Sequence, residues 1–409
     1  MDLLRFARTN ASFLSAGALM LFMSSFGQSF FIAIFAGHLR EVFGISHGQW
    51  GGIYMLGTTG SALVMVWAGA LTDVFRVRVL GPAVLIGLAL ACVVMATNHS
   101  LWLLPLSIFL LRFLGQGMSG HIGFVAMSRW FIASRGKAMS IASLGYSVGE
   151  AILPLIFVAL MAWFDWRSLW LIAAVLCLVG IALLYPLLGQ ERTPQMLAAT
   201  QSGPGMDGRQ WTRAQALRTP VFWLIALAML GLPAFNTAIF FHQVHLAEVK
   251  GWSHVQLVAL FPVFTLSTVV SVFVFGWAID RYSSVRLVPF HQIPVIAAFV
   301  VFSLADSPPA MLLGYVLLGT TAGAHNTLFN AFWAEVFGTA HLGAIKALAA
   351  AVMVLGSAIG PGLTGLGIDI GFELEAQFVA IACWFALSTT VIVVAVAGIR
   401  TRLPGPAAD

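Results

Sequence analysis

Charged residues are scarce in this 409-residue sequence: only 9% of positions are Asp, Glu, Lys or Arg, whereas 60% are hydrophobic. The mean hydropathy is +0.95. A chain of this composition cannot hide its apolar surface in one water-soluble core, so the composition excludes an ordinary soluble protein and indicates a lipid environment. Cysteine is also rare, with three residues and no metal-ligand spacing. We therefore expect no disulfide framework, no metal site and no cofactor.

Runs of about 20 apolar residues, the length that crosses a bilayer, recur along the chain. We expect membrane-spanning helices near residues 12–37, 50–72, 79–97, 102–128, 138–163, 168–188, 220–245, 255–279, 287–305, 309–333, 344–367 and 376–399. Polar residues at 189–219 interrupt the pattern and predict a linker, with a short amphipathic helix around 211–217. The predicted fold class is an all-α membrane protein with bundles at 1–188 and 220–409.

The sequence also matches itself at an offset of 207 residues. Residues 38–49 and 245–256 are identical at eight of twelve positions, and Asp73 and Gly149 fall on Asp280 and Gly356. Internal repeats of several spans are typical of solute transporters built from two related halves. We therefore predict twelve transmembrane helices in two pseudo-symmetric six-helix bundles.

Basic residues are distributed unevenly between the two ends of these helices. If the N-terminus is cytoplasmic, sixteen of the twenty Lys and Arg lie on that side, and only Arg40, Arg167 and Lys250 lie on the other. The positive-inside rule then places both termini and the linker in the cytoplasm, with the chain spanning a bacterial inner membrane. The net charge of +5 reflects this bias, so no nucleic-acid partner is expected.

Short motifs carry a resemblance to a known family. The segment from Gly69 to Asp73, followed by Arg76 and Arg78, resembles the loop signature of the major facilitator superfamily, and residues 276–281 repeat it after the eighth span. Arg112 with Gly115, Gln116 and Gly117 is similar to the family's second motif, and the run 129–138 resembles a connection in monocarboxylate-type porters. The resemblance implies a secondary transporter that works by alternating access.

The same resemblance implies a gating role for the repeated loop signature. Asp73 and Asp280 can accept hydrogen bonds at a neighbouring helix N-terminus, where an anion is favoured. We expect Asp73 to pair with Arg129, and Asp280 to pair with Lys346, in one state of the cycle and not in the other. The alternative is a static surface salt bridge worth about 0–1 kcal/mol.

Function should depend on positions at which the two copies differ. Arg112 and Glu150 are the ionisable residues expected near mid-depth, and their counterparts at the offset are Gly319 and Ser357. An ionisable side chain inside a membrane costs about 2.5–3.5 kcal/mol on insertion scales, so it is rarely kept without use. We predict that Glu150 binds the coupling proton and that Arg112 tunes it. The alternative is a structural ion pair between the fourth and fifth helices.

The resemblance assigns the central pathway to spans 1, 4, 7 and 10, which carry amide and aromatic side chains. The substrate-binding candidates there are Gln28, Phe31, Gln116, Asn236, His325, Asn326, Asn330 and Trp333. This set suits a flat or amphiphilic organic solute. Monocarboxylate-type porters commonly hold the carboxylate with a basic residue deep in the C-terminal half. Spans 7 to 10 contain no interior Lys or Arg, so the resemblance does not imply a carboxylate substrate. For each amide the alternative is an interhelical hydrogen bond.

We therefore expect a monomeric transporter, not an enzyme, that moves a small organic solute with protons as the coupling ion. A nucleotide-binding loop of the type Gly-x-x-x-x-Gly-Lys-Ser/Thr is absent, which argues against an ATP-driven pump. Residues 24–35 and 46–54 faintly resemble a branch with vitamin and copper importers, so copper import is one alternative. A non-transporting nutrient sensor with the same fold is another. We interpret the repeated Ser46-His47 and Ser253-His254 as helix caps and interfacial histidines.

Overall fold

The computed structural model describes residues 3–69, 71–131, 135–189, 205–338 and 342–403. Within these ranges the chain forms helices and no strand. Eleven of the described helical segments are long and apolar enough to cross a membrane. The remaining long helix, α19 (Pro308–Phe337), has sufficient length but lower hydropathy, because polar residues such as His325 and Asn326 occupy its middle. The all-α, twelve-helix fold predicted from the sequence is confirmed.

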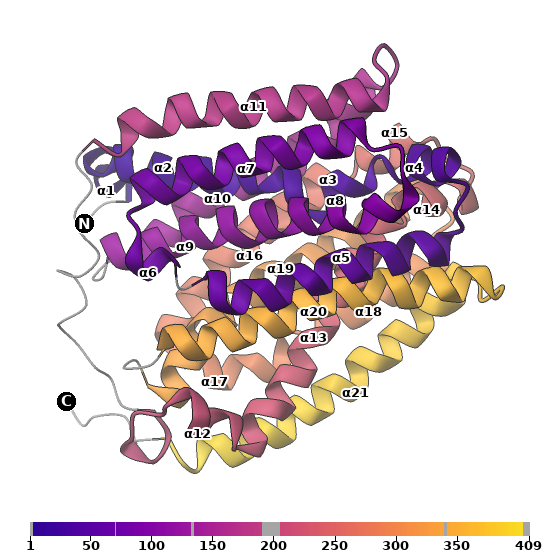
Figure 1. The fold of residues 1–409 in the computed structure, drawn as a ribbon. Coiled ribbons are helices and arrows are strands. Elements are labelled where there is room, and N and C mark those ends of the chain that lie inside the picture. The colour runs from indigo at the N-terminus through magenta and orange to yellow at the C-terminus, as the bar shows by residue number, and fades with distance from the viewer. Residues whose placement is uncertain (1–2, 70, 132–134, 190–204, 339–341, 404–409) are drawn as a thin grey trace. The chain divides into compact units, whose positions relative to one another are not determined.

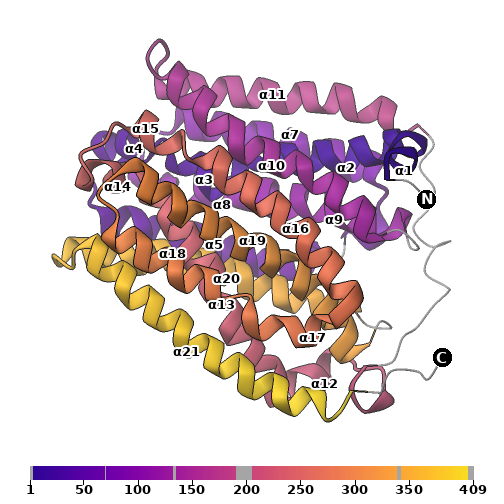
Figure 2. The same cartoon turned by 180° about the vertical axis from the view of Figure 1, so that it is seen from behind.

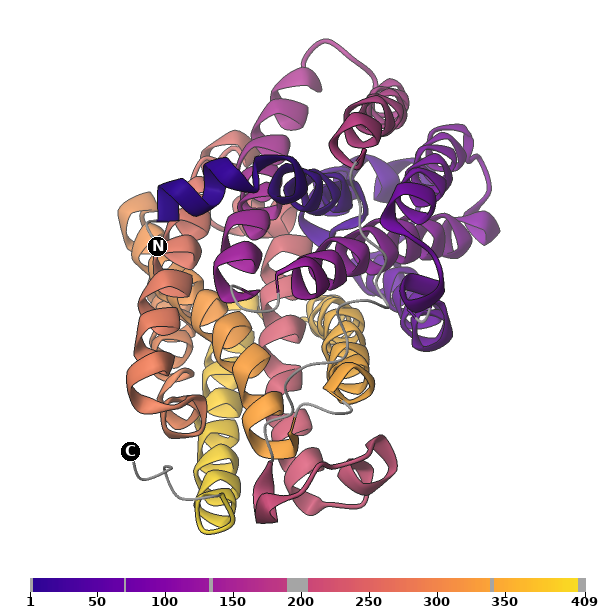
Figure 3. The same ribbon diagram turned by 90° about the vertical axis from the view of Figure 1, so that its left-hand side faces the viewer.

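The first six spans follow the expected boundaries to within a few residues. They comprise α2 (Ala11–Met23) with α3 (Ser29–Ala33), α5 (His47–Ala68), α7 (Val77–Thr97), α8 (Leu104–Leu111) with α9 (Gly120–Trp130), α10 (Arg135–Leu160) and α11 (Trp166–Leu187). Three short helices accompany them: α1 (Leu3–Thr9), α4 (Ala36–Phe43) and α6 (Leu71–Val74). α1 lies across the end of α2 (Figure 3).

The last six spans repeat this arrangement along the chain. They comprise α13 (Pro220–Phe241), α15 (His254–Val258) with α16 (Phe261–Tyr282), α17 (Ser284–Leu287) with α18 (Ile293–Leu304), α19, α20 (Leu342–Asp369) and α21 (Leu374–Arg400). α14 (Gln243–Val249) follows α13. The short helix expected in the linker forms at α12 (Arg213–Leu217), where Thr212 and Gln215 make a capping box.

The repeated Ser-His-x-Gln segments begin helices α5 and α15. The Ser46 hydroxyl accepts from the backbone N–H of Gln49 (3.1 Å), and the Gln49 side chain accepts from the backbone N–H of Ser46 (2.9 Å). Ser253 and Gln256 make the same reciprocal bonds, at 3.3 and 2.8 Å. These capping boxes satisfy N–H groups that a helix start leaves without partners. The capping interpretation of this repeat is confirmed.

The chain divides into two compact units. The first comprises Met1–Ala199, Thr237–Pro262 and Ala358–Ile370; the second comprises Thr200–Asn236, Val263–Ser357 and Gly371–Asp409. The first unit therefore contains the whole first sequence copy and, from the second copy, the end of α13, α14, α15, the start of α16 and the end of α20. Within it, α7 runs beside α11, and α10 runs beside α2 (Figures 1 and 2).

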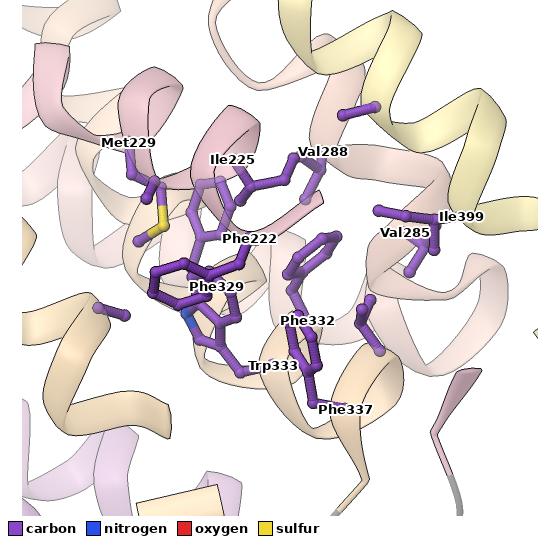
Figure 4. Close-up of a cluster of buried hydrophobic side chains, with 14 of the residues drawn as sticks. Phe222, Ile225, Met229, Val285, Val288, Phe329, Phe332, Trp333, Phe337 and Ile399 are labelled. Carbon is purple, nitrogen blue, oxygen red and sulfur yellow. The ribbon is translucent and has the colours of Figure 1, made fainter. Parts of the chain in front are cut away.

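In the second unit, α18 packs against both α19 and α21 (Figure 2). An apolar cluster fills the unit near the ends of α13 and α19, and includes Phe222, Phe329 and Trp333 (Figure 4). The end of the linker is attached here, because the backbone N–H of Trp211 donates to the carbonyl of Phe337 (3.0 Å). Arg402, just beyond α21, makes two hydrogen bonds to the Asp207 carboxylate, at 2.6 and 3.1 Å.

Candidate functional site

The first span is interrupted at Gln28. α2 runs into a 3-10 turn at Ser24–Gly27, Gln28 is extended (φ −84°, ψ 154°), and α3 begins at Ser29. Gly27 packs against Gly115 of span 4 so closely that a Cβ on Gly115 would lie 2.6 Å from the Gly27 Cα. An interrupted helix leaves backbone carbonyls without intrahelical partners inside the protein, and these need other donors.

Arg112 supplies such a donor. Its side chain is 0% exposed, and it begins a π-helical segment, Arg112–Ser119, between α8 and α9. Its Nη1 donates to the Gly27 carbonyl and to the Ser29 hydroxyl, both at 3.2 Å. The Tyr54 ring lies 5.3 Å from its guanidinium carbon, and the Tyr54 and Ser29 hydroxyls are hydrogen bonded to each other. The buried cation is thus placed against the helix break and an aromatic face, both of which favour it.

Glu150 lies in the same region. Its side chain is 3% exposed, and Tyr146, one turn earlier on α10, donates its hydroxyl to Glu150 Oε1 (3.1 Å). Tyr146 lies near both Glu150 and Arg112, and Tyr54 lies near Arg112. The structure therefore brings both predicted proton-coupling residues into one group, Ser29, Tyr54, Arg112, Tyr146 and Glu150, which we term the buried polar cluster.

No member of the buried polar cluster is repeated in the second copy. At the offset of 207, the five positions carry Asn236, Phe261, Gly319, Met353 and Ser357. Sequence reasoning did not select Tyr54 or Ser29. The available signal for Tyr54 was its hydroxyl group, because the equivalent position of the other copy is Phe261 and the chain has only five tyrosines.

Three further candidates lie in the first unit. Gln28, at the break, and Gln116, on the π-helical segment, are partly buried. Phe31 is fully buried, with ring centroids 4.8 Å from Phe157 and 5.3 Å from Trp170. The sequence prediction assumed one regular helix through Gln28 and Phe31, but the extended backbone at Gln28 breaks that spacing and turns Phe31 into an aromatic core.

His325, a candidate in the second unit, is buried beside a second histidine. Its Nδ1 lies 3.4 Å from Nε2 of His291, which sits just before α18, and the Phe329 ring is 4.7 Å from its own. The sequence analysis did not select His291. The available signal was that the equivalent position of the other copy, Val84, is apolar. The Asn236 Oδ1 atom is buried and has no hydrogen-bond partner among the described residues. It is therefore an acceptor that a ligand or an ordered water can satisfy.

The remaining candidates lie on α19. Asn326 and Asn330 are exposed, and the Asn330 amide donates to the Asn326 carbonyl (2.7 Å). Lys346 donates to the Asn330 Oδ1 (3.3 Å). Trp333 shares the helical face of these asparagines but is only 2% exposed, because it belongs to the apolar cluster of Figure 4.

Of the four predicted gating side chains, the structure describes one. Those of Asp73, Arg129 and Asp280 lie outside the described residues, whereas Lys346 has the contact with Asn330 given above. An acidic residue that sequence reasoning did not select, Glu335, ties down the loop after the second signature. It accepts hydrogen bonds from the Ser283 and Ser284 hydroxyls and from the Ser284 backbone N–H (3.1 Å). Among the described residues, no group of three or more His, Cys, Asp or Glu side chains is arranged to hold a metal ion.

Comparison with known proteins identifies relatives of the whole arrangement. The family model described as Major Facilitator Superfamily matches residues 17–361. Monocarboxylate transporter 13 from Bos taurus is 25% identical over 320 residues, which cover 76% of this chain and 72% of that protein. The membrane sensor protein UhpC from Salmonella typhimurium is 22% identical over 229 residues, covering 52% of each chain.

A solved structure shows the same fold. It is a bacterial homolog of the human lysosomal transporter Spinster, in an inward-facing and unoccupied conformation. The two chains superpose with a TM-score of 0.71 at 15% identity, covering 97% of this chain and 99% of that one.

Proposed function

The chain belongs to the major facilitator superfamily, and from this membership we propose that it is a secondary active transporter that moves a small organic solute by alternating access with protons as the coupling ion. Positive residues concentrated at the end of the helices that carries the termini support cytoplasmic termini in a bacterial inner membrane. Both copies of the repeat lie in one chain, which supports a working monomer.

The observation that carries this proposal is the buried polar cluster. A carboxyl group that is almost fully buried binds a proton more readily than an exposed one, whereas a nearby cation opposes the proton. Glu150 is buried, and Tyr146, whose hydroxyl donates to it, also lies near Arg112. A movement of span 1 that displaces the Gly27 carbonyl changes the hydrogen bonds of Arg112, and through Tyr146 it changes the surroundings of Glu150. Proton binding and the shape of the first span are thereby coupled.

We propose that the solute is bound by polar side chains that are exposed, partly buried or left without a hydrogen-bond partner. Gln28 and Gln116 flank the buried polar cluster, and the unsatisfied Asn236 Oδ1 and the exposed Asn326 are acceptors in the second unit. Amide groups with neighbouring aromatic rings favour a flat or amphiphilic organic molecule. For the loop signature we propose gating by Asp73 with Arg129 and by Asp280 with Lys346.

The test has two steps. First, purified protein is screened by thermal shift against metabolites, vitamins and amphiphilic drugs, because a ligand that prefers the folded state raises its stability. Second, the radiolabelled hit is offered to proteoliposomes with and without a pH gradient. Accumulation that requires the gradient supports the proposal, and binding without any accumulation contradicts it.

A sensor is the second candidate, and the similarity to the membrane sensor protein UhpC favours it. A sensor uses the same ligand-dependent change of shape to contact a partner, so it does not need to release its ligand on the other side. The uptake experiment separates the two functions, since a sensor binds the hit from the thermal-shift screen but leaves the vesicle lumen empty.

A further inference from the structure

The two sequence copies are joined at the end of the helices away from the termini. In the first compact unit, Oδ2 of Asp369, the last residue of α20, accepts hydrogen bonds from the Ser46 hydroxyl (2.7 Å) and the Gly48 backbone N–H (2.9 Å). These partners lie 323 and 321 positions away, in the other copy. Asp369 thus caps the N-terminus of α5, a 22-residue helix, where a negative charge is favoured.

Glycines bring the two backbones together at this contact. A Cβ on Gly51 would lie 2.7 Å from the Pro361 carbonyl, and one on Gly365 would lie 2.8 Å from the His47 carbonyl. A Cβ on Gly48 would overlap the Asp369 carboxylate itself. The helices therefore approach as closely as their backbones permit, and the carboxylate fits because residue 48 has no side chain.

The equivalent helices, α10 and α15, also lie in contact, but the Asp369 carboxylate has no counterpart in the sequence of the other copy. Ser46 and Gln49 have the counterparts Ser253 and Gln256, which make the same capping box on α15. The position equivalent to Asp369 is Ala162, which has no acceptor in its side chain. The scaffold is thus duplicated, whereas the carboxylate that bridges the copies exists on one side alone.

We propose that Asp369 is a positioning residue of the transport cycle, whose carboxylate holds α5 against α20 and thereby sets the fraction of molecules that are closed at this end. The inference rests on the alternating-access function proposed above, since such a cycle requires the copies to separate here. Asp369 is exposed, so water can replace its two hydrogen bonds when the helices part. A contact of this kind is specific in geometry and inexpensive to break, as a reversible closure requires.

The test measures the separation of the copies directly and needs no substrate. Spin labels are attached to Val42→Cys on α4 and Val249→Cys on α14, which are equivalent positions of the two copies and are 52% and 44% exposed. A Cys383→Ser background removes the exposed native thiol, while Cys92 and Cys177 are buried. Double electron–electron resonance on the full chain in liposomes then gives the ratio of long to short distances.

Two substitutions break the contact in different ways. Asp369→Ala removes the acceptor and is expected to raise the open-to-closed ratio about tenfold, equivalent to about 1.4 kcal/mol and within the usual effect of losing a helix cap. Asp369→Asn keeps a neutral acceptor and should give a shift of only a few fold. Gly48→Ala keeps the carboxylate in the protein but displaces it from the start of α5, so it should shift the ratio in the same direction as Asp369→Ala.

Two matched controls separate positioning from general stability. Asp165 caps α11 at the same end of the helices, but its partners, the N–H groups of Arg167 (3.1 Å) and Ser168 (3.4 Å), belong to its own copy. Asp165→Ala should therefore lower thermal stability without moving the labels. Gly52→Ala adds a methyl group where nothing lies within 4 Å and should behave as the parent protein does.

An unchanged distance distribution in Asp369→Ala overturns the proposal, as does an equal shift in Asp165→Ala. The transport proposal fails separately, through absence of solute accumulation, which the distance measurement does not involve. A protein that senses rather than transports can still show the Asp369 effect.

Discussion

Replacing Glu150 by glutamine is expected to uncouple the transporter from the proton gradient. Glutamine keeps the size of the side chain and an oxygen that accepts from Tyr146, but it cannot bind a proton. A hydrogen bond to a carboxylate contributes about 1.5–3 kcal/mol and one between neutral groups about 0.5–1.5 kcal/mol, so the folded state should lose about 1 kcal/mol. The variant should therefore fold and melt slightly earlier than the parent protein.

The assay compares accumulation with exchange for the solute found by thermal shift. One proton per solute and a gradient of one pH unit support about a tenfold accumulation, because 1.4 kcal/mol corresponds to a factor of ten. In Glu150→Gln the ratio should fall to about one, while exchange of labelled for unlabelled solute continues. Ser357→Ala is the matched control, because Ser357 is the equivalent position of the other copy and its hydroxyl donates to the carbonyl of Val354 in its own helix (2.8 Å). This variant should accumulate solute as the parent protein does. Gradient-driven accumulation that persists in Glu150→Gln would refute the assignment.

Three further predictions concern the second unit. The hydrogen bonds from Arg402 hold the pKa of the Asp207 carboxyl below its usual range. This anchor of the linker is therefore fully formed above about pH 4 and is lost as the pH falls through the lowered pKa. Amide hydrogen exchange of residues 205–217 should rise at that low pH, and Asp207→Asn should show the same rise at pH 7. Glu335→Gln should weaken the hydrogen bonds that Glu335 accepts from Ser283 and Ser284 at the start of α17 by about 1–3 kcal/mol. Amide hydrogen exchange over residues 283–287 should then increase, and unchanged exchange would contradict the role given to Glu335. Trp333→Ala should cost about 3–5 kcal/mol in thermal unfolding, whereas intact stability with lost ligand binding would indicate a pathway residue instead.

The sequence predicted the membrane spans well because the signals for them are local. Hydropathy over about 20 residues and the change to polar residues at 189–219 depend on neighbours along the chain. The capping boxes of α5 and α15 are likewise local, since Ser46 pairs with Gln49 and Ser253 with Gln256, three residues along the chain. Arg112 and Glu150 were found by a different route, the comparison of two copies, and the structure places both in the buried polar cluster.

Other features were set by contacts that no local pattern encodes. No local sequence pattern near Gln28 predicts an extended residue inside an apolar run. The helix can be interrupted inside the protein because Arg112, 85 positions from Gly27, donates a hydrogen bond to the Gly27 carbonyl. Phe31 was expected to face a solute on the assumption of regular helical spacing, and the same interruption places it in an aromatic core instead.

By itself, then, the sequence predicted the all-α membrane fold, the positions of the long apolar helices to within a few residues, and which half carries the unmatched charges. The tertiary structure alone decided which distant groups meet: Tyr54 with Arg112, His291 with His325, and Asp369 with the start of α5. The physical reason is that apolar burial depends on composition within one segment, whereas a buried polar group needs a specific partner. That partner is supplied by the packing of helices that are distant in the sequence, 34 positions apart for His291 and His325 and 321 for Gly48 and Asp369.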